Sequence, residues 1–135
     1  MDKIDKNTRS RNMSLIKSKN TSPELIVRKW LHAQGFRFRI HKKNLPGTPD
    51  IVLPKHNLIV FINGCFWHQH PGCKRASLPK SNKEYWIPKL EKNIANQRIA
   101  SKQLCLAGWR VLILWECEIR NSNKYQSLLR SFLNF

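Results

Sequence analysis

The chain has 135 residues, a hydrophobic fraction of 41% and a formal net charge of +17. This length fits one domain around a single core, and no apolar run reaches membrane-spanning length. The excess of 25 Lys and Arg over 8 Asp and Glu is typical of proteins that bind nucleic acid. Five tryptophans argue against a basic ribosomal protein, and the lack of a signal-like first segment predicts an intracellular protein without membrane association.

The first third of the chain contains an arm and a helix. Residues 1–20 are polar and basic with little apolar periodicity, which predicts an arm that orders only on its partner. Residues 21–135 are then the folded domain. The segment Thr21-Ser22-Pro23-Glu24 looks like a helix start, with a capping hydroxyl and an early proline. We expect the first helix to begin there and to stop at Gly35.

Four segments have the alternating or continuous apolar pattern of strands, namely residues 36–40, 50–53, 58–62 and 110–115. Ser81 and Glu84 resemble a capping box that opens a long helix ending before Gly108, and a closing helix is expected over 125–135. Cys105 lies in the long helix without a partner motif, and we expect it to be a small buried side chain. The element order predicts an α/β fold, with a mixed sheet flanked by helices.

Thiol and imidazole side chains gather in one short loop and at one later position. They are Cys65, His68, His70, Cys73 and Cys117. Three sulfurs and one nitrogen are the ligand set of a closed tetrahedral zinc site, which predicts a structural Zn²⁺. Spacing alone does not settle whether His68 or His70 is the nitrogen ligand, and the other histidine is free to act as a base near neutral pH.

A second metal site is expected at Asp50, which opens a strand directly after a Pro-Gly-Thr-Pro turn. A carboxylate in such a place can hold Mg²⁺ through oxygen, with the backbone carbonyl of Ile62 as a second ligand. The alternative is an aspartate that merely caps the turn through its own backbone.

The tryptophans and one phenylalanine divide into two groups. Phe66, Trp67 and Trp86 stand in polar surroundings, where they can wedge between stacked bases or else cover the metal site and join the core. The other three fall on apolar patterns and are assigned to the core: Trp30, Trp109 and Trp115.

Four blocks of the sequence resemble the very short patch repair endonucleases, the Vsr family. They are TRSRNM at 8–13, LPGTPD at 45–50, GCFWH at 64–68 and GWRVLILWEC at 108–117. The resemblance runs nearly end to end. It implies a restriction-endonuclease-like fold with a structural zinc. It also implies an enzyme that nicks DNA on the 5′ side of the thymine in a T·G mismatch left by deamination of 5-methylcytosine.

The resemblance also implies roles for single residues. Asp50 and the carbonyl of Ile62 would hold Mg²⁺, His68 would activate water, and Glu24 would be an acidic catalytic residue near the active centre. The zinc ligands would be Cys65, His70, Cys73 and Cys117, and the residues that contact DNA would be Met13, Phe66, Trp67, Trp86, Lys89 and Asn93.

The same resemblance sets expectations about partners and location. The substrate would be double-stranded DNA with a T·G mismatch, and a cytosine-5 methyltransferase would be functionally linked to the protein. Mismatch-repair proteins are candidate partners. We expect a monomer in the cytoplasm, associated with the nucleoid.

Two positions depart from the family pattern. Asn63 stands where the family often has a histidine, and Gln97 stands where it often has an aspartate. Loss of an acid that orients the active-site histidine or metal-bound waters is expected to weaken activity by about one or two orders of magnitude. Two alternatives therefore stay open: a mismatch-binding protein with little or no turnover, and a restriction or phage-defence endonuclease with the same fold.

Overall fold

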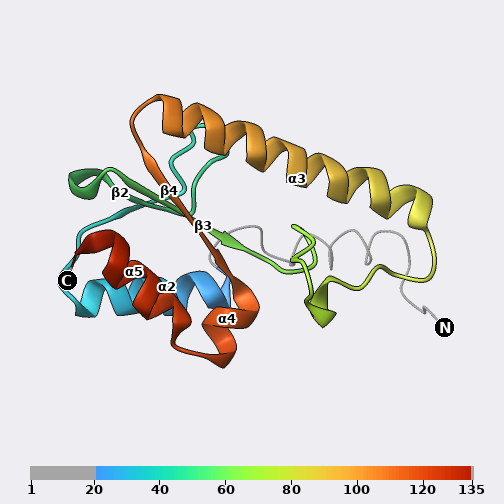
Figure 1. Cartoon of the computed structure of the whole chain (residues 1–135), viewed down its shortest axis with the longest axis horizontal. Coiled ribbons are helices and arrows are strands. Elements are labelled where there is room, and N and C mark those ends of the chain that lie inside the picture. Colours follow the sequence, from blue (N-terminus) through green and yellow to red (C-terminus); the bar gives the residue numbers. More distant parts are fainter. Residues whose placement is uncertain (1–20, 135) are drawn as a thin grey trace, which may run out of the picture.

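The computed structural model describes residues 21–134 (Figure 1). Its helices and strands are α2 (Ser22–Ala33), β1 (Arg39–Ile40), β2 (Ile51–Leu53), β3 (Leu58–Asn63), α3 (Lys83–Leu106), β4 (Arg110–Trp115), α4 (Glu116–Asn121) and α5 (Lys124–Leu133). The expected basic arm and Met13 lie outside the described residues, so the division at residue 20 stays a prediction. Within the described range, no helix is both long and apolar enough to cross a bilayer.

The strands form one four-stranded sheet in the order β1-β2-β3-β4. β1, β2 and β3 pair antiparallel, whereas β4 pairs parallel to β3 from Leu58↔Arg110 to Asn63↔Trp115. A parallel pair requires a crossover connection, and α3 lies in the connection between β3 and β4. The structure thus confirms the expected mixed sheet flanked by helices.

Helices cover the sheet on both faces. Figure 1 shows α3 on one side and α2, α4 and α5 on the other. Leu58 and Val60 of β3 pack into the core shared with α2, α4 and α5, while Ile59 and Phe61 pack with Leu104 of α3. This alternation is the period of two expected for a strand buried on both faces, which explains why β3 reads as a continuous apolar run.

Some elements differ from the expectation. The strand over 36–40 is reduced to Arg39–Ile40, the two residues that pair with β2, although Phe36 and Phe38 pack against the core as expected for a half-buried segment. α3 begins at Lys83, where Asn82 occupies the capping position at a φ of 58° without a side-chain bond, so the capping box is wrong. α4 was not expected, since it follows β4 directly without a turn signal.

Two side-chain assignments also need correction. Cys105 is exposed, because it lies on the solvent side of α3, a helix with only three buried residues. The tryptophans assigned to the core, Trp30, Trp109 and Trp115, are only half-buried, and of these Trp30 and Trp109 pack against the core. Indole is large enough that one edge commonly stays at the surface.

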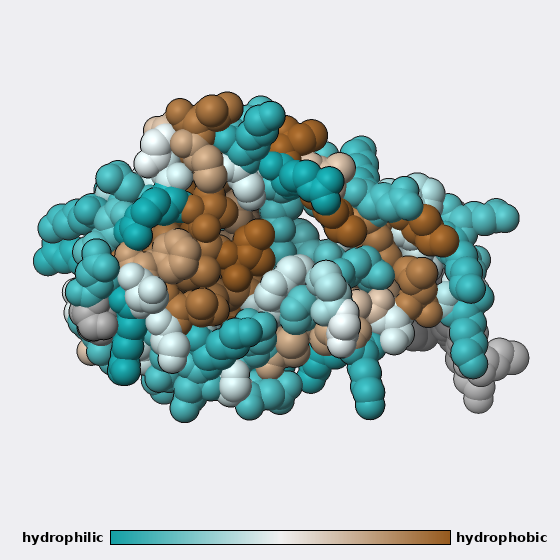
Figure 2. Space-filling model, viewed as in Figure 1, coloured by the Kyte–Doolittle hydropathy of each residue, from teal (hydrophilic) through white to brown (hydrophobic). Residues whose placement is uncertain are grey.

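The turn before β2 fixes where Asp50 enters the sheet. Gly47 has a φ of +76°, and a β-carbon there would lie 2.8 Å from Cβ of Ala100 and 3.1 Å from the ring of Phe61. Only glycine combines this backbone conformation with so close an approach to α3. On the face drawn in Figure 2, apolar surface gathers over the sheet between α3 and α5, and hydrophilic side chains cover most of the rest.

Candidate functional site

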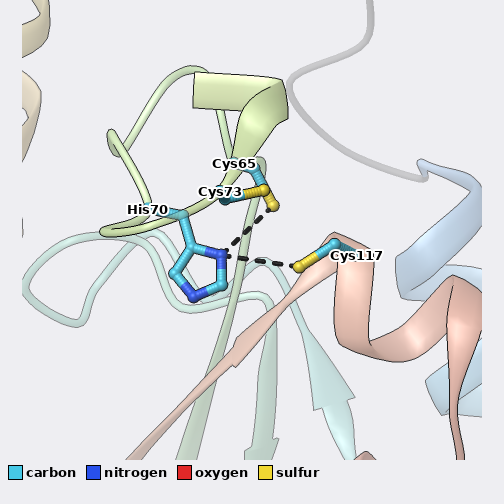
Figure 3. A group of neighbouring side chains, drawn as sticks. All are labelled: Cys65, His70, Cys73 and Cys117. Carbon is cyan, nitrogen blue, oxygen red and sulfur yellow. Dashed lines mark hydrogen bonds between the residues drawn. The ribbon is translucent and has the colours of Figure 1, made fainter. Parts of the chain in front are cut away.

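One cysteine and histidine group joins the loop after β3 to the start of α4. The ligand atoms of Cys65, His70, Cys73 and Cys117 all lie within 4.8 Å of one another. Nδ1 of His70 is 3.6 Å from Sγ of Cys65 and 3.5 Å from Sγ of Cys117 (Figure 3). A tetrahedral zinc ion with ordinary bond lengths would hold a nitrogen and a sulfur about 3.6 Å apart, so the arrangement fits such an ion.

Neighbouring residues support this group. The ring of His70 stacks on Trp115 at a centroid distance of 4.1 Å and an angle of 9°. Oε1 of Glu116 accepts a hydrogen bond from the backbone N–H of Cys65 at 3.0 Å. Burial raises the pKa of the Cys65 thiol to about 12, so a bound cation is needed to keep it as a thiolate. It is His70, and not His68, that lies in this group.

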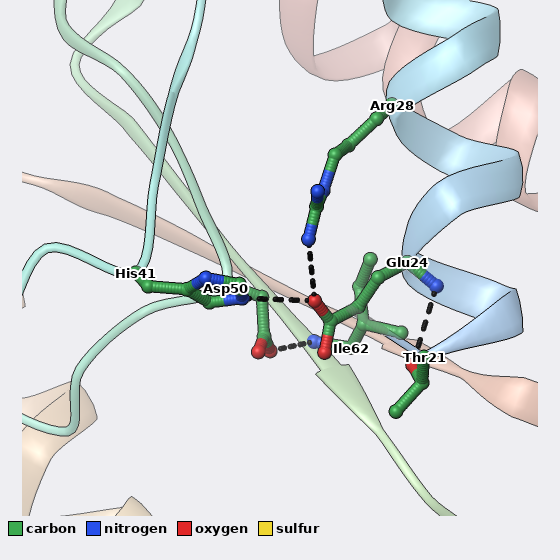
Figure 4. A network of polar contacts seen from close by, with 6 residues as sticks. All are labelled: Thr21, Glu24, Arg28, His41, Asp50 and Ile62. Carbon is green, nitrogen blue, oxygen red and sulfur yellow. Dashed lines mark hydrogen bonds and ion pairs between the residues drawn. The ribbon is translucent and has the colours of Figure 1, made fainter. Parts of the chain in front are cut away.

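A second group brings together two carboxylates and a histidine, those of Glu24, Asp50 and His41. Oδ2 of Asp50 accepts a hydrogen bond from the N–H of Ile62 at 2.6 Å. Oε2 of Glu24 accepts from Nη2 of Arg28 and contacts Nε2 of His41, both at 2.9 Å (Figure 4). The ligand atoms of Glu24, His41 and Asp50 lie within 4.8 Å of one another, so this group could also hold a metal ion.

The second group is electrostatically incomplete without a cation. Desolvation by burial is the largest cause that raises the pKa of Asp50 from 3.8 to about 7, the Ile62 N–H opposes the rise, and the charge of Glu24 adds to it. Near neutral pH the Asp50 carboxyl group is therefore protonated for part of the time. A divalent cation between Asp50 and Glu24 would replace that proton and relieve the repulsion.

His68 faces the same pocket as this acidic pair. The pocket is lined by Glu24, His41, Asp50, Ile62, Asn63, Trp67, His68, Lys89, Asn93, Gln97 and Glu116, among others. Nδ1 of His68 is buried without a hydrogen-bond partner among the described residues. Burial lowers the pKa of His68, which favours the neutral imidazole that a general base requires.

The two residues that depart from the family pattern bind each other. Nδ2 of Asn63 donates to Oε1 of Gln97 at 2.8 Å, and Nε2 of Gln97 donates to Oδ1 of Asn63 at 2.7 Å. Asn63 ends β3 and is 2% exposed, whereas Gln97 lies in the middle of α3. This reciprocal pair satisfies two amides inside the pocket and ties the helix to the sheet.

An aromatic cluster adjoins the pocket through Trp67, which is part of the pocket lining. The rings of Phe66, Trp67 and Trp86 lie 5.3 to 5.8 Å apart in edge-on or tilted contacts. Tyr85 adds a fourth ring, 5.0 Å from Trp86, and its hydroxyl accepts a hydrogen bond from Nζ of Lys89 at 3.1 Å. Nδ2 of Asn93 donates to the carbonyl of Trp67 at 3.4 Å.

The structure thus brings together the described residues named from the sequence. Glu24, Asp50, Ile62, His68, Trp67, Lys89 and Asn93 line one pocket, and Phe66 and Trp86 adjoin Trp67. Sequence reasoning missed His41, Arg28 and Tyr85. Arg28 had a detectable signal, since it stands four residues after Glu24 on a predicted helix. His41 follows a short strand without any motif, and only the fold brings it to Glu24.

Comparisons with known proteins agree on one family. The family model for the DNA mismatch endonuclease Vsr matches residues 1–75. The type II nicking enzyme V.XorIIP of Xanthomonas oryzae pv. oryzae is 45% identical over 98% of this chain and 97% of its own length. The DNA mismatch endonuclease Vsr of Escherichia coli K12 is 40% identical over 91% of this chain and 78% of its own length.

A third relative, the type II nicking enzyme V.NmeAIP of Neisseria meningitidis, is 45% identical over 81% of this chain and 77% of its own length. The residues that the family model matches include the turn before Asp50 and the loop from Cys65 to Cys73. The mixed sheet is the restriction-endonuclease-like architecture that the sequence predicted. The chain therefore belongs to the Vsr family of DNA mismatch endonucleases, hydrolases that act on DNA.

Proposed function

We propose that this endonuclease nicks one DNA strand 5′ of the thymine in a T·G mismatch, as the first step of very short patch repair. The observation that carries the proposal is the shared pocket, in which Asp50, Glu24 and His68 face the same space as Trp67 and Lys89. Groups suited to phosphodiester hydrolysis and a ring suited to stacking on a base thus lie beside each other. A nuclease that cuts next to a distorted base pair requires this combination.

The hydrolytic half of the mechanism uses few residues. Asp50, with the carbonyl of Ile62, would hold Mg²⁺, and that ion when bound would neutralise charge that develops on the scissile phosphate. The Ile62 N–H holds one oxygen of Asp50 in place, and Glu24 adds negative charge nearby. Neutral His68 would accept a proton from the attacking water, and its buried surroundings would keep other water away.

The aromatic half explains how a mismatch would be chosen. Phe66, Trp67 and Trp86 already touch one another, so they can enter the duplex as a single wedge. A T·G pair stacks poorly, and the cost of separating it from its neighbour is lower than for a paired step. Lys89 and Asn93 on α3, together with Met13, would contact DNA beside the wedge, and basic residues would bind flanking phosphates.

The four-ligand group would serve a structural purpose. Cys65, His70, Cys73 and Cys117 would bind Zn²⁺ with no open position for substrate. The ion would fix the loop that carries Phe66, Trp67 and His68. The proposal also makes the enzyme a cytoplasmic, nucleoid-associated monomer that acts after a cytosine-5 methyltransferase, with mismatch-repair proteins as candidate partners.

A nicking assay on matched duplexes tests this function. Three end-labelled duplexes that differ only in a T·G, T·A or C·G pair are incubated with Mg²⁺ and the zinc-loaded chain. We expect one cut, 5′ of the thymine, in the T·G duplex alone. Asp50→Ala is expected to bind this duplex without cutting it, and His68→Ala to cut at least about a hundredfold more slowly.

The same assay separates the alternatives. A wild-type chain that binds the T·G duplex and never cuts it is a mismatch-binding protein. Equal cutting of the T·G and fully paired duplexes identifies a restriction or defence endonuclease. Either result would overturn the proposed function while leaving the family assignment intact.

A further inference from the structure

We propose that His41 joins Asp50 and Glu24 as a protein ligand of the metal ion at Asp50, and that its nitrogen makes this site prefer a first-row transition ion such as Mn²⁺ over Mg²⁺. The inference rests on the proposed role of Asp50 as a metal ligand. It adds a residue for which neither the sequence motifs nor the family pattern supplied a role.

Geometry places His41 at the ion position. Its ligand nitrogen lies within 4.8 Å of the carboxylate oxygens of both Glu24 and Asp50. In Figure 4 the imidazole of His41 points at Glu24, beside the carboxylate of Asp50, although the three residues come from different segments. Atoms bound at right angles to one ion would lie about 3 Å apart, so a modest closure of the group would complete the site.

The backbone holds His41 in this place. Its φ is 46°, a left-handed conformation that is uncommon for a residue other than glycine. Its N–H donates to the carbonyl of Asp50 at 3.4 Å, which links the two proposed ligands through one backbone contact. The side chain is only 14% exposed. A side chain fixed in this way loses little conformational freedom when it binds an ion.

The contact between His41 and Glu24 is compatible with an exchange of proton for metal. Nε2 of His41 lies 2.9 Å from Oε2 of Glu24, so the two atoms share one hydrogen bond. An ion bound through Nε2 would require the neutral ring to carry its single hydrogen on Nδ1, and any proton displaced from Nε2 would pass to solvent. Arg28 keeps its 2.9 Å contact with Glu24 and offsets one of the two carboxylate charges.

Ligand chemistry then decides which ion is favoured. Mg²⁺ prefers oxygen ligands and gives up water reluctantly, whereas imidazole nitrogen suits first-row transition ions. One histidine and two carboxylates therefore favour Mn²⁺ over Mg²⁺. A site formed only by Asp50 and the Ile62 carbonyl would have no such preference from nitrogen.

The test measures ion binding directly, without DNA. Zinc-loaded protein is titrated with Mn²⁺ and the free ion is followed by electron paramagnetic resonance, with Mg²⁺ as competitor. Electron spin echo envelope modulation of bound Mn²⁺ then reports whether a nitrogen is directly bonded. We expect one nitrogen coupling in the wild type, which changes when the protein is labelled with ¹⁵N-histidine, and binding of Mn²⁺ at least about tenfold tighter than Mg²⁺.

Three variants identify the nitrogen. His41→Gln keeps an amide that can still donate to Glu24, and it is expected to lose the coupling and about tenfold of the Mn²⁺ preference. His68→Gln is expected to retain the coupling, although His68 lines the same pocket. His32→Gln, at an exposed position of α2, is the matched control and should bind both ions as the wild type does.

The outcomes distinguish this inference from the proposed function. Absence of the coupling in the wild type, or its persistence in His41→Gln, overturns the inference. A wild type that nicks T·G duplexes with Mg²⁺ but shows no nitrogen coupling leaves the proposed function standing. Conversely, a chain with histidine-bound Mn²⁺ that nicks no duplex supports the inference and removes the function. The wild-type ¹⁵N measurement does not depend on whether any variant folds.

Discussion

Asp50 is a buried carboxyl held beside a second one, and this placement lowers stability when no cation is bound. In the unfolded chain it ionises near 3.8, whereas in the folded protein its pKa is about 7. Between about pH 4 and pH 7, Asp50 is therefore mostly ionised in the unfolded chain but mostly protonated in the folded protein. The destabilising contribution of Asp50 is therefore absent below this window, grows across it and is full above it.

Asp50→Asn keeps the shape of the protonated side chain and cannot ionise. Without divalent ions, we expect this variant to be more stable than the wild type by about 2–4 kcal/mol at pH 8, and by roughly half as much at pH 5. Urea denaturation at the two pH values measures the difference. Mg²⁺ should stabilise the wild type at pH 8 and leave Asp50→Asn nearly unchanged. An equal gain at both pH values would show that ionisation of Asp50 is not the cause.

Asn63 and Gln97 show how two departures from a pattern can support each other. The sequence suggested only that an orienting acid was lost at position 97. In the structure, Gln97 and Asn63 exchange two hydrogen bonds, so each amide is the partner that the other requires. In this chain the two positions thus form a neutral hydrogen-bonded pair, while the expected loss of activity stays a prediction.

A double-mutant cycle measures this coupling. Asn63→Ala and Gln97→Ala should each lower the free energy of unfolding by about 1–3 kcal/mol, since each leaves a polar group without its partner inside the pocket. The double variant should cost less than the sum of the single variants, by about 1 kcal/mol or more. Urea denaturation gives all three values. Additive losses would mean that the two amides do not depend on each other.

At the scale of elements, prediction from sequence was best where periodicity was strong. α2, β3 and β4 lie close to their expected limits, because their apolar spacing is regular and the capping hydroxyl expected at the start of α2 is present, on Thr21. α4 was missed because Glu116 continues directly from β4, and six residues are too few for a helical period. The capping box failed because sequence spacing does not report the backbone conformation of Asn82.

The site was predicted unevenly for the same kind of reason. Cys65, His70 and Cys73 lie close in the sequence, so their grouping could be expected, and the fold adds Cys117 through the start of α4. Glu24 entered only through family resemblance, since nothing local marks it as functional. His41 was missed because its contact spans seventeen residues and depends on how the turn before Asp50 packs. Local patterns predict ligands within one loop better than ligands from separate segments.

The cysteine loop is an element with little regular structure, so its stability should depend on the bound metal. Cys117→Ser removes the ligand that joins the loop to α4, and we expect a lower zinc content and a thermal midpoint lower by about 10 °C or more. Cys105→Ser is the matched control, because Cys105 is exposed on α3 and lies outside the group. Metal analysis and thermal denaturation of both variants test this. A Cys117→Ser protein that loses zinc but melts like the wild type would show that the ion does not support the fold.

At the scale of the whole molecule, the net charge of +17 should govern affinity for DNA. Each phosphate that a Lys or Arg neutralises releases counterions, so the logarithm of the binding constant falls linearly with the logarithm of salt concentration. A protein that makes roughly six to ten such contacts loses about 10³ to 10⁵ in affinity between 50 and 200 mM salt. We expect an affinity loss of this size on both T·G and fully paired duplexes, because phosphate contacts are independent of base sequence.

Substitution of single lysines then shows which of them contact DNA phosphates. Lys89 lines the pocket beside Trp67, and Lys89→Gln should make the salt dependence shallower by about one charge contact. Lys124 pairs with Glu118 at 3.3 Å and is absent from the pocket lining, so Lys124→Gln should leave the slope unchanged. Fluorescence anisotropy at several salt concentrations measures both. If the two variants lose the same slope, the positive charge acts as a diffuse field, and α3 carries no specific phosphate contact at Lys89.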